Sequence, residues 1–162
     1  MAAVSAPKPG IGAKMYRNTG TYASPTWAEV DAVLNCTLTL NWNFAEAGSR
    51  ATRAMIQQKT RFDHTVTCDM RADDADTDYA AFRTAALSPT SSLDLLVLDG
   101  SLATEGVRGF RAHYQINLTS QPQEADGSIY DQFELKPAPN ADSAGVAGIV
   151  VGVNSNFTET QL

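Results

Sequence analysis

Histidine and basic residues are scarce in this 162-residue chain, and their scarcity excludes several classes of function. The two histidines lack the matched cysteine or carboxylate spacing of a zinc site. His64 lies on an apolar strand face and is expected in the core, whereas His113 lies on a polar face and is expected at solvent or an interface. Twelve Lys and Arg against eighteen Asp and Glu give a net charge of −6, which disfavours tight nonspecific binding to nucleic acid. Because no Gly-x-Ser-x-Gly motif or pair of carboxylates stands out, the sequence predicts no enzyme and no cofactor.

Cysteine and long hydrophobic runs are scarce too. Two cysteines, Cys36 and Cys68, do not make a disulfide framework in a chain this long, and both fall on apolar strand faces. We expect buried free thiols, with a disulfide as the alternative if the two strands are neighbours. Residues 144–153 are apolar but only half as long as a membrane span. Because the N-terminal residues also lack the apolar run of a signal peptide, we expect a soluble protein that is made in a cytosol and has no membrane anchor.

The chain is rich instead in long segments that alternate apolar and polar residues. In residues 36–44, Cys, Leu, Leu, Trp and Phe share one face, while Thr, Thr, Asn and Asn share the other. Residues 59–70, 107–119 and 128–136 show the same pattern, and residues 93–98 form a nearly continuous apolar run. Period-two alternation indicates strands with one buried face and one polar face. The sequence therefore predicts a wide antiparallel sheet whose polar side is a working surface.

The length and the 43% hydrophobic content predict one domain with arms. Residues 1–13 are Pro/Gly-rich and are expected to form an N-terminal arm, residues 14–137 the β domain, and residues 138–162 a C-terminal strand or arm. Within the domain, residues 45–58 lack a strand pattern and are interpreted as a long hairpin loop, and a short helix is expected at about 76–87. These elements predict a mainly β fold, an antiparallel β-sandwich or barrel-like structure with one flanking α-helix.

Three acidic residues, Asp74, Asp76 and Asp78, have the spacing that begins an EF-hand calcium loop. The rest of that motif is missing, because its sixth position is Tyr79 rather than Gly and its twelfth is Ala85 rather than Glu. We therefore interpret the acids as caps of the predicted helix and expect no metal.

Three passages of the sequence resemble bacteriophage tail tube (major tail) proteins. They are residues 14–30, residues 78–85 continuing to 95–100, and residues 106–117, and the likeness covers most of residues 14–136. The resemblance implies a β-sandwich or barrel-like subunit with one flanking helix. It also implies that such subunits form hexameric rings, which stack into a hollow tube through which phage DNA is ejected.

The resemblance further implies the partners and the location of the protein. Copies of the chain would contact one another within and between rings, and the tube would meet tail tip or baseplate, tape measure and tail terminator proteins. DNA would be present only transiently in the lumen. The protein would belong to the tail of a virion after synthesis in the host cytoplasm. Tube proteins of type VI secretion and other contractile injection systems share the implied fold, so such a tube is an alternative function.

The polar faces of the four long strands are the candidates for the lining of such a channel. Polar, weakly charged side chains suit a DNA conduit because strong positive charge would trap the phosphates. The opposite assignment, with these faces outward, stays open. Alternation shows which residues share a face of the sheet but not whether that face points into the channel or away from it. The lumen-facing candidates are Thr39, Asn41, Asp63, Thr65, Thr67, Gln115, Asn117, Gln132 and Glu134.

The loop at residues 45–58 is the candidate element for stacking one ring on the next. Loops of this length in compact domains are usually functional or disordered, and this one separates two long strands. We expect it to become ordered against the adjacent ring, where its arginines would meet acidic groups such as those of residues 73–78. The stacking candidates are Arg50, Arg53, Met55, Gln57 and Gln58.

A carbohydrate-binding β-sandwich module is an alternative from a different class. Its stacking residues would be Trp27, Trp42 and Tyr130. Trp42 shares an apolar face with Leu40 and Phe44, so we expect it in the core, which counts against this function. The lack of a signal peptide also counts against a secreted module.

Overall fold

The computed structural model describes residues 13–46, 57–122, 127, 129–138, 148–153 and 156–161. Within these residues the chain forms nine strands and one helix. No helix of this described part has the length and apolar character of a membrane span. The strands are β1 (Lys14–Asn18), β2 (Trp27–Glu29), β3 (Val33–Glu46), β4 (Gln57–Arg71), β5 (Leu93–Leu98), β6 (Arg108–Ser120), β7 (Tyr130–Pro137), β8 (Gly148–Val153) and β9 (Asn156–Gln161), and the helix is α1 (Thr77–Leu87).

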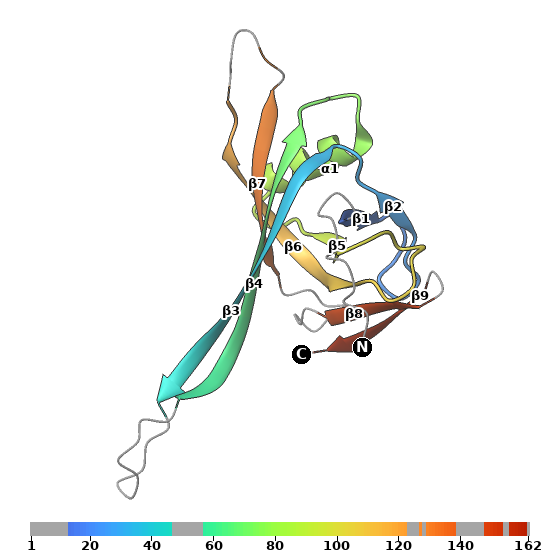
Figure 1. Ribbon diagram of the computed structural model, residues 1–162. Coiled ribbons are helices and arrows are strands. Elements are labelled where there is room, and N and C mark those ends of the chain that lie inside the picture. The colour runs from blue at the N-terminus through green and yellow to red at the C-terminus, as the bar shows by residue number, and fades with distance from the viewer. Residues whose placement is uncertain are drawn as a thin grey trace, which may run out of the picture.

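The strands form one antiparallel sheet with the order β2-β1-β5-β6-β7-β4-β3. β6 is its branch point, because one edge pairs with β5 while the other pairs with β8 over residues 108–111 and with β7 over residues 114–120. β9 pairs with β8, so the C-terminal segment that we expect to be one strand or an arm contains two strands. The sheet is rolled, and α1 lies beside it (Figure 1). The predicted mainly β, antiparallel fold with one flanking helix is confirmed.

The main core lies on the inner face of the rolled sheet. Period-two alternation puts every second residue of β4, β6 and β7 on this face, and α1 packs against it. Met15 of β1, Met70 of β4 and Phe133 of β7 belong to one buried cluster with Tyr79 and Phe82 of α1. The rings of Phe82 and Phe133 meet edge to face with 5.8 Å between their centroids. Strands that are distant in the sheet order thus share one core, and this shared core stabilises the roll.

The helix begins where the acidic residues predict. Asp76 is its N-cap, and the Oδ1 atom accepts hydrogen bonds from the backbone N–H groups of Asp78 (2.8 Å) and Tyr79 (3.0 Å). Asp78 lies in the first turn, where its charge suits the helix dipole, and its Oδ1 accepts from Nε of Arg17 at 2.6 Å. The capping interpretation is confirmed for Asp76, and Asp78 supplies the expected charge in the first turn, whereas Asp74 accepts from Nη1 of Arg83 at 3.2 Å instead. Among the described residues, no group of three His, Cys, Asp or Glu side chains is arranged to hold a metal ion.

A second, smaller core covers the opposite face of the sheet at β1, β5 and the start of β6. The loop from β1 to β2 folds over this face, and the ring of Tyr22 stacks on that of His113 with 5.3 Å between centroids. His113 is therefore buried, and its expected place at solvent or an interface is wrong. Alternation identifies its face of the strand correctly, but alternation does not reveal that a distant loop covers that face. The members of this second core are Tyr16, Leu96, Leu98 and Val107, with Trp27 and Leu102 packed against them.

The β3–β4 hairpin extends beyond the rest of the sheet. β3 and β4 pair with each other along almost their whole lengths, whereas β4 pairs with β7 only at residues 66–71. Residues 39–46 of β3 and 57–65 of β4 consequently form a two-stranded ribbon, called the arm below. The arm projects from the body of the subunit (Figure 1).

The strands of the arm continue into the segment that the sequence predicts to be a loop. β3 ends at Glu46 and β4 begins at Gln57, so both ends of the expected loop at residues 45–58 are strand. Gln57 and Gln58 are exposed, and their register partners are Glu46 and Ala45. The other stacking candidates, Arg50, Arg53 and Met55, lie outside the described residues.

The two cysteines lie opposite each other on β3 and β4. Cys36 is the register partner of Cys68, and both thiols are free. Cys68 is buried, and burial raises the pKa of its thiol, but Cys36 is exposed. The expectation of two buried thiols is therefore correct for Cys68 and wrong for Cys36, because β3 is the last strand of the sheet order.

Candidate functional site

A polar face runs across β3, β4, β7 and β6, on the side of the sheet opposite the main core. Cross-strand partners share a face of a sheet, and the register joins the lumen-facing candidates in this way. The pairs are Thr39–Thr65, Asn41–Asp63, Thr67–Glu134 and Asn117–Glu134, with Gln115 and Gln132 two residues along the same strands. All nine candidates therefore lie on one face. Thr65 and Glu134 are half-buried, and the other seven are exposed.

Hydrogen bonds join the polar face from one strand to the next. Nδ2 of Asn35 on β3 donates to Oδ2 of Asp69 at 3.3 Å, and Nε2 of Gln132 on β7 donates to Oδ1 of the same carboxylate at 3.2 Å. The hydroxyl of Thr119 on β6 donates to the backbone carbonyl of Gln132 at 2.9 Å. This ladder crosses all four strands. Asn35, Asp69 and Thr119 are absent from the sequence-based candidates, although alternation along each strand is a signal that places them on this face.

The charges of the polar face are mixed. Asp63, Asp69 and Glu134 are acidic, whereas Arg71 and Lys136 are basic, and Lys136 lies 3.3 Å from Glu134 as an ion pair. Thr, Asn and Gln side chains make up most of the remaining surface. A surface that retains nucleic acid needs clustered cations, and the described part of this face has none.

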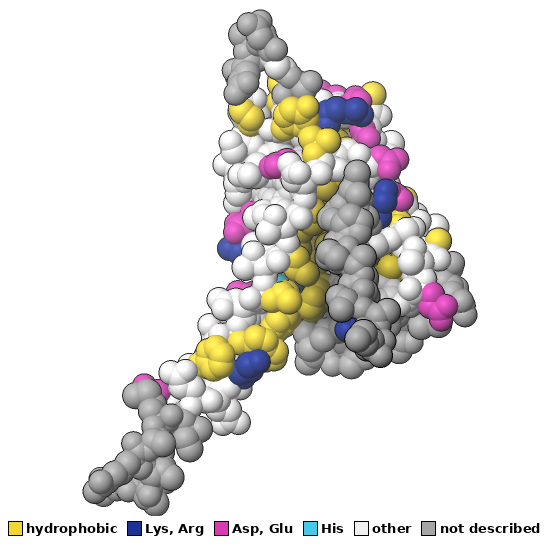
Figure 2. Space-filling model, in the orientation of Figure 1, with side chains coloured by type: hydrophobic (Ala, Val, Ile, Leu, Met, Phe, Trp, Pro, Cys, Tyr) yellow, Lys and Arg dark blue, Asp and Glu magenta, His cyan; other side chains and the backbone are white. Residues whose placement is uncertain are grey.

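The opposite face of the arm is apolar and uncovered. Leu40 is 50% exposed, Trp42 37% and Phe44 56%, and together they form the arm band, which is visible as a run of hydrophobic side chains along the arm (Figure 2). The ring of Trp42 contacts that of Phe62 with 4.9 Å between centroids, and Nζ of Lys59 lies 5.1 Å from the Trp42 centroid. The expected place of Trp42 in the core is wrong, because β3 continues past the end of the body.

Where the arm joins the body, the same apolar face becomes core. His64 is buried, its Nε2 lies 2.8 Å from the hydroxyl of Tyr114, and its ring stacks on those of Phe62 and Phe110. The prediction that His64 is a core residue is confirmed. Burial lowers the pKa of its imidazole, and the nearby Asp63 carboxylate opposes this shift less strongly. His64 is thus neutral at pH 7 and connects the base of the arm to β6.

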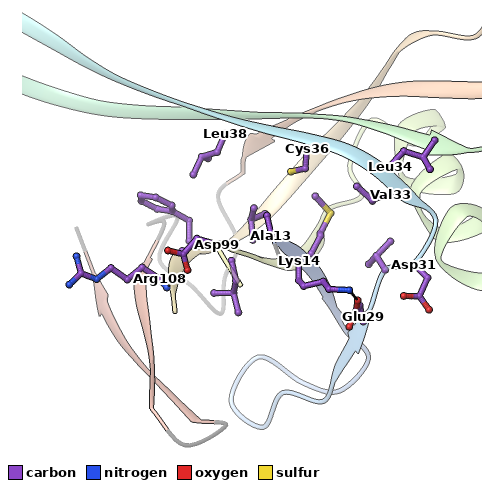
Figure 3. A pocket seen from close by; sticks show the side chains of 16 residues that line it. Ala13, Lys14, Glu29, Asp31, Val33, Leu34, Cys36, Leu38, Asp99 and Arg108 are labelled. Atoms are coloured by element: carbon purple, nitrogen blue, oxygen red, sulfur yellow. Dashed lines mark hydrogen bonds and ion pairs between the residues drawn. The ribbon is translucent and has the colours of Figure 1, made fainter. Parts of the chain in front are cut away.

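A groove of about 500 Å³ opens between the start of β3 and the strands β1, β5 and β6. The sheet is rolled but not closed here, because β3 pairs only with β4 among the described strands. The side chains of Cys36 and Leu38 point into the groove from β3 (Figure 3). Its rim is charged, since Lys14 pairs with Glu29 at one end, close to the exposed Asp31, and Asp99 and the exposed Arg108 lie at the other end. The groove therefore combines an apolar floor with a rim of mixed charge.

No protein-family model matches the chain, and no curated protein matches its sequence. Its structure, however, matches solved structures of tails. A chain in the tail of an empty gene transfer agent particle with C6 symmetry matches with a TM-score of 0.62 and 12% sequence identity, over 83% of this chain and 96% of that chain. The SPP1 tail tube matches with a TM-score of 0.61 and 9% identity, over 80% of this chain and 75% of that chain. The chain has the tail tube fold.

A further structural match covers nearly the whole sequence. A third match, in the virion of a native gene transfer agent particle, has a TM-score of 0.57 and 10% identity, and it covers 95% of this chain and 99% of that chain. At these identities the arrangement of strands, rather than shared residues, carries the likeness. The resemblance seen in the sequence is confirmed at the level of the fold.

The tail tube fold separates the three residues that a carbohydrate-binding module would use for stacking. Trp27 packs against the second core, whereas Trp42 lies on the arm. Tyr130 pairs with Arg71 of β4, and Trp42 pairs with Phe62 of the same strand. Phe62 and Arg71 are nine positions apart along β4, about 30 Å at roughly 3.3 Å per residue. Trp42 and Tyr130 therefore form no common stacking platform.

Proposed function

We propose that the chain is the structural subunit of a virion tail tube and has no enzymatic role. Six copies form a ring, and rings stack into a tube through which DNA is ejected. The observation that supports this most directly is the tail tube fold, shared with a tail chain over 83% of this sequence, and the C6 symmetry of that tail supports the number six. The tube would meet tail tip or baseplate proteins at one end and a tail terminator at the other, and would hold a tape measure protein.

Two strand edges of the subunit support closure into a ring. β3 pairs only with β4 among the described strands, and β6 pairs with β5 only as far as Tyr114, so residues 115–120 of β6 have one edge without a described partner. Long unpaired edges are templates for pairing with another chain. In the proposed ring, β3 of one copy pairs with this part of β6 in the next copy. The four-stranded polar sheets then join into a closed barrel without exposed edges.

The barrel formed in this way has room for DNA. Six copies with four strands each, spaced by roughly 4.8 Å, give a circumference of about 115 Å and a diameter of about 37 Å, which strand tilt widens further. With the polar face inward, the channel wall consists mainly of Thr, Asn and Gln side chains with an ion pair between Lys136 and Glu134. Because such a wall has few cations, it does not bind DNA phosphates tightly. The nine candidates on this face are then lumen residues.

Microscopy of the purified protein tests the proposal. We expect negative-stain images to show rings or tubes of uniform width, with six-fold symmetry in end views. Size-exclusion chromatography with light scattering should show a mass that rises with protein concentration. A strictly monomeric protein at the highest attainable concentration would count heavily against a tube subunit.

A further inference from the structure

The arm is a marginal structure by itself. A two-stranded hairpin needs a third strand or packing on its apolar face to be stable, and no described strand pairs with residues 57–65 of β4 except β3. The arm band of Leu40, Trp42 and Phe44 is nevertheless exposed. The other face of the same strand carries the exposed polar side chains of Asn41 and Asn43. An apolar band confined to one face of a projecting ribbon indicates a surface that another molecule covers.

The subunit cannot cover the arm band with its own groove. Leu38 lines the groove, but β3 then leaves it as an extended strand that stays paired with β4 as far as Glu46. At roughly 3.3 Å per residue, Phe44 lies about 20 Å beyond Leu38. The inner end of the band lies closer, because the ring of Phe62 contacts both Trp42 and the groove residue Phe110, with 4.9 and 5.9 Å between centroids. The outer end of the arm band is therefore out of reach of the groove of the same subunit.

We propose that the arm band of one copy docks in the groove of a second copy of this chain. The groove is the open side of the roll, where core-facing side chains such as Leu38 remain accessible in a volume of about 500 Å³. Charge favours one orientation of the arm, because the exposed Lys59 lies beside Trp42, and the rim carries the exposed Asp31 at one end and the exposed Arg108 at the other. Arm and groove are unlike surfaces, so the contact is heterologous and repeats from copy to copy.

This docking rests on the proposed tube function and deepens it, because a repeating contact between unlike surfaces is what links subunits into a tube. It assigns the contact to the described stem of the arm, with Trp42 as the central anchor. Buried aromatic anchors carry most of the affinity of such interfaces. Replacing Leu40, Trp42 and Phe44 with Thr should therefore raise the dissociation constant of the contact about tenfold or more, while Thr preserves strand propensity.

The fluorescence of Trp42 reports docking directly. The chain has two tryptophans, so Trp27→Phe leaves Trp42 as the only one. A reporter protein carries Trp27→Phe and Leu34→Glu, which charges its own groove but leaves its arm intact, and Leu34 is 53% exposed, so this change spares the core. A receiver protein carries Trp27→Phe with Thr at Leu40, Trp42 and Phe44, so it has no tryptophan and an intact groove.

Adding the receiver should shift the emission of the reporter to shorter wavelength until the signal saturates, because the Trp42 ring leaves water. A control receiver that also carries Leu34→Glu should cause no shift. As a matched control for the arm, Asn41→Thr and Asn43→Thr in the reporter change the opposite face of the same strand and should preserve the shift. Absence of a shift with the receiver, or an equal shift with the control receiver, would overturn the proposal.

Folding and tube assembly are measured separately. Circular dichroism melts establish that each variant is folded, and Leu34→Gln replaces Leu34→Glu in both proteins if the charged variant melts early. Tubes that form in the Trp27→Phe protein without a Trp42 shift would overturn the docking and retain the tube function. A concentration-dependent shift in a protein that never forms rings or tubes would retain the docking and overturn the tube function.

Discussion

Arg111 and Asp94 form a buried ion pair that holds the β1–β2 loop on the sheet. Nε and Nη2 of Arg111 donate to the two carboxylate oxygens of Asp94 at 3.1 and 2.8 Å, and the side chains are 5% and 6% exposed. Nη2 also donates to the backbone carbonyl of Tyr22 at 2.8 Å. The guanidinium lies 3.8 Å from the ring centroid of Tyr22 and 5.1 Å from that of Trp27, while Nδ2 of Asn18 donates to Asp94 at 2.8 Å. The Arg111 guanidinium thus contacts both the β1–β2 loop and the sheet.

Replacing Arg111 with Met should cost about 3–5 kcal/mol of unfolding free energy, because the Asp94 carboxylate stays buried without a charged partner. At about 2–4 °C per kcal/mol for a chain of this size, the Tm should fall by roughly 6–20 °C. The double change Arg111→Met with Asp94→Leu removes the unpaired charge and should recover at least half of the loss. The exposed pair of Arg83 and Asp74, at 3.2 Å, is the matched control, and Arg83→Ala should cost at most about 1 kcal/mol.

Thermal and urea unfolding, followed by circular dichroism at a concentration that keeps the protein monomeric, measures each cost. In a Trp42→Phe background, the emission of Trp27 reports the environment of the β1–β2 loop separately. In the Arg111→Met variant this emission should change, because the Trp27 ring no longer contacts the Arg111 guanidinium. An Arg111→Met variant that unfolds no more easily than Arg83→Ala would refute the reasoning. A double variant less stable than the single Arg111→Met variant would refute it as well.

Replacing Thr65 and Asn117 with Lys should leave the subunit folded and the tube intact. Each Lys that touches DNA should, however, add roughly one phosphate contact, which makes DNA binding in the channel tighter and more dependent on salt concentration. Phage that carry both changes should build tails yet eject DNA poorly, and normal ejection would weaken the lumen assignment. Deleting residues 48–56, which lie outside the described residues, should leave rings that do not stack; tubes of normal length in micrographs would exclude this role. Unfolding free energy should decline as the pH falls below about 6.5, because burial lowers the pKa of His64 in the folded state and the unfolded chain then binds more protons. His64→Gln should flatten that part of the profile, and an unchanged slope would assign the pH dependence to other groups.

Alternation and capping signals predict the elements of this fold because both are local. The apolar run at residues 93–98 is β5, and the alternating segment at residues 36–44 lies inside β3. The helix expected at about 76–87 corresponds to α1 (Thr77–Leu87), since its start is marked by the capping residue Asp76 and its end by Pro89, both close to it in the sequence. The same periodicity puts all nine lumen candidates on one face of the sheet, because the face of a strand residue depends only on its position along that strand.

Burial, by contrast, depends on what covers each face, and that contact is long-range. Arg111 and His113 alternate like exposed residues, yet the β1–β2 loop covers them through Tyr22. Trp42 alternates like a core residue, yet no described part of the same subunit buries it. In both cases the alternation assigns the residue to the correct face of the strand, but it does not predict whether another part of the chain covers that face. Alternation does not predict the groove either, because the groove is bounded by strands that are distant in the sequence.

The length of β3 relative to the body makes the error at Trp42 informative. In a monomer, an apolar residue beyond the end of the core gains nothing from burial and adds a risk of aggregation. β3 nevertheless keeps its alternation past Leu38, which packs against the core, to Trp42 and Phe44. Its other face stays polar at Asn41. Such a two-faced extension has a physical reason if the arm is an internal element of a larger object, with a second copy on one face and a water-filled channel on the other. The pattern along β3 and the arrangement of the nine strands therefore support assembly independently.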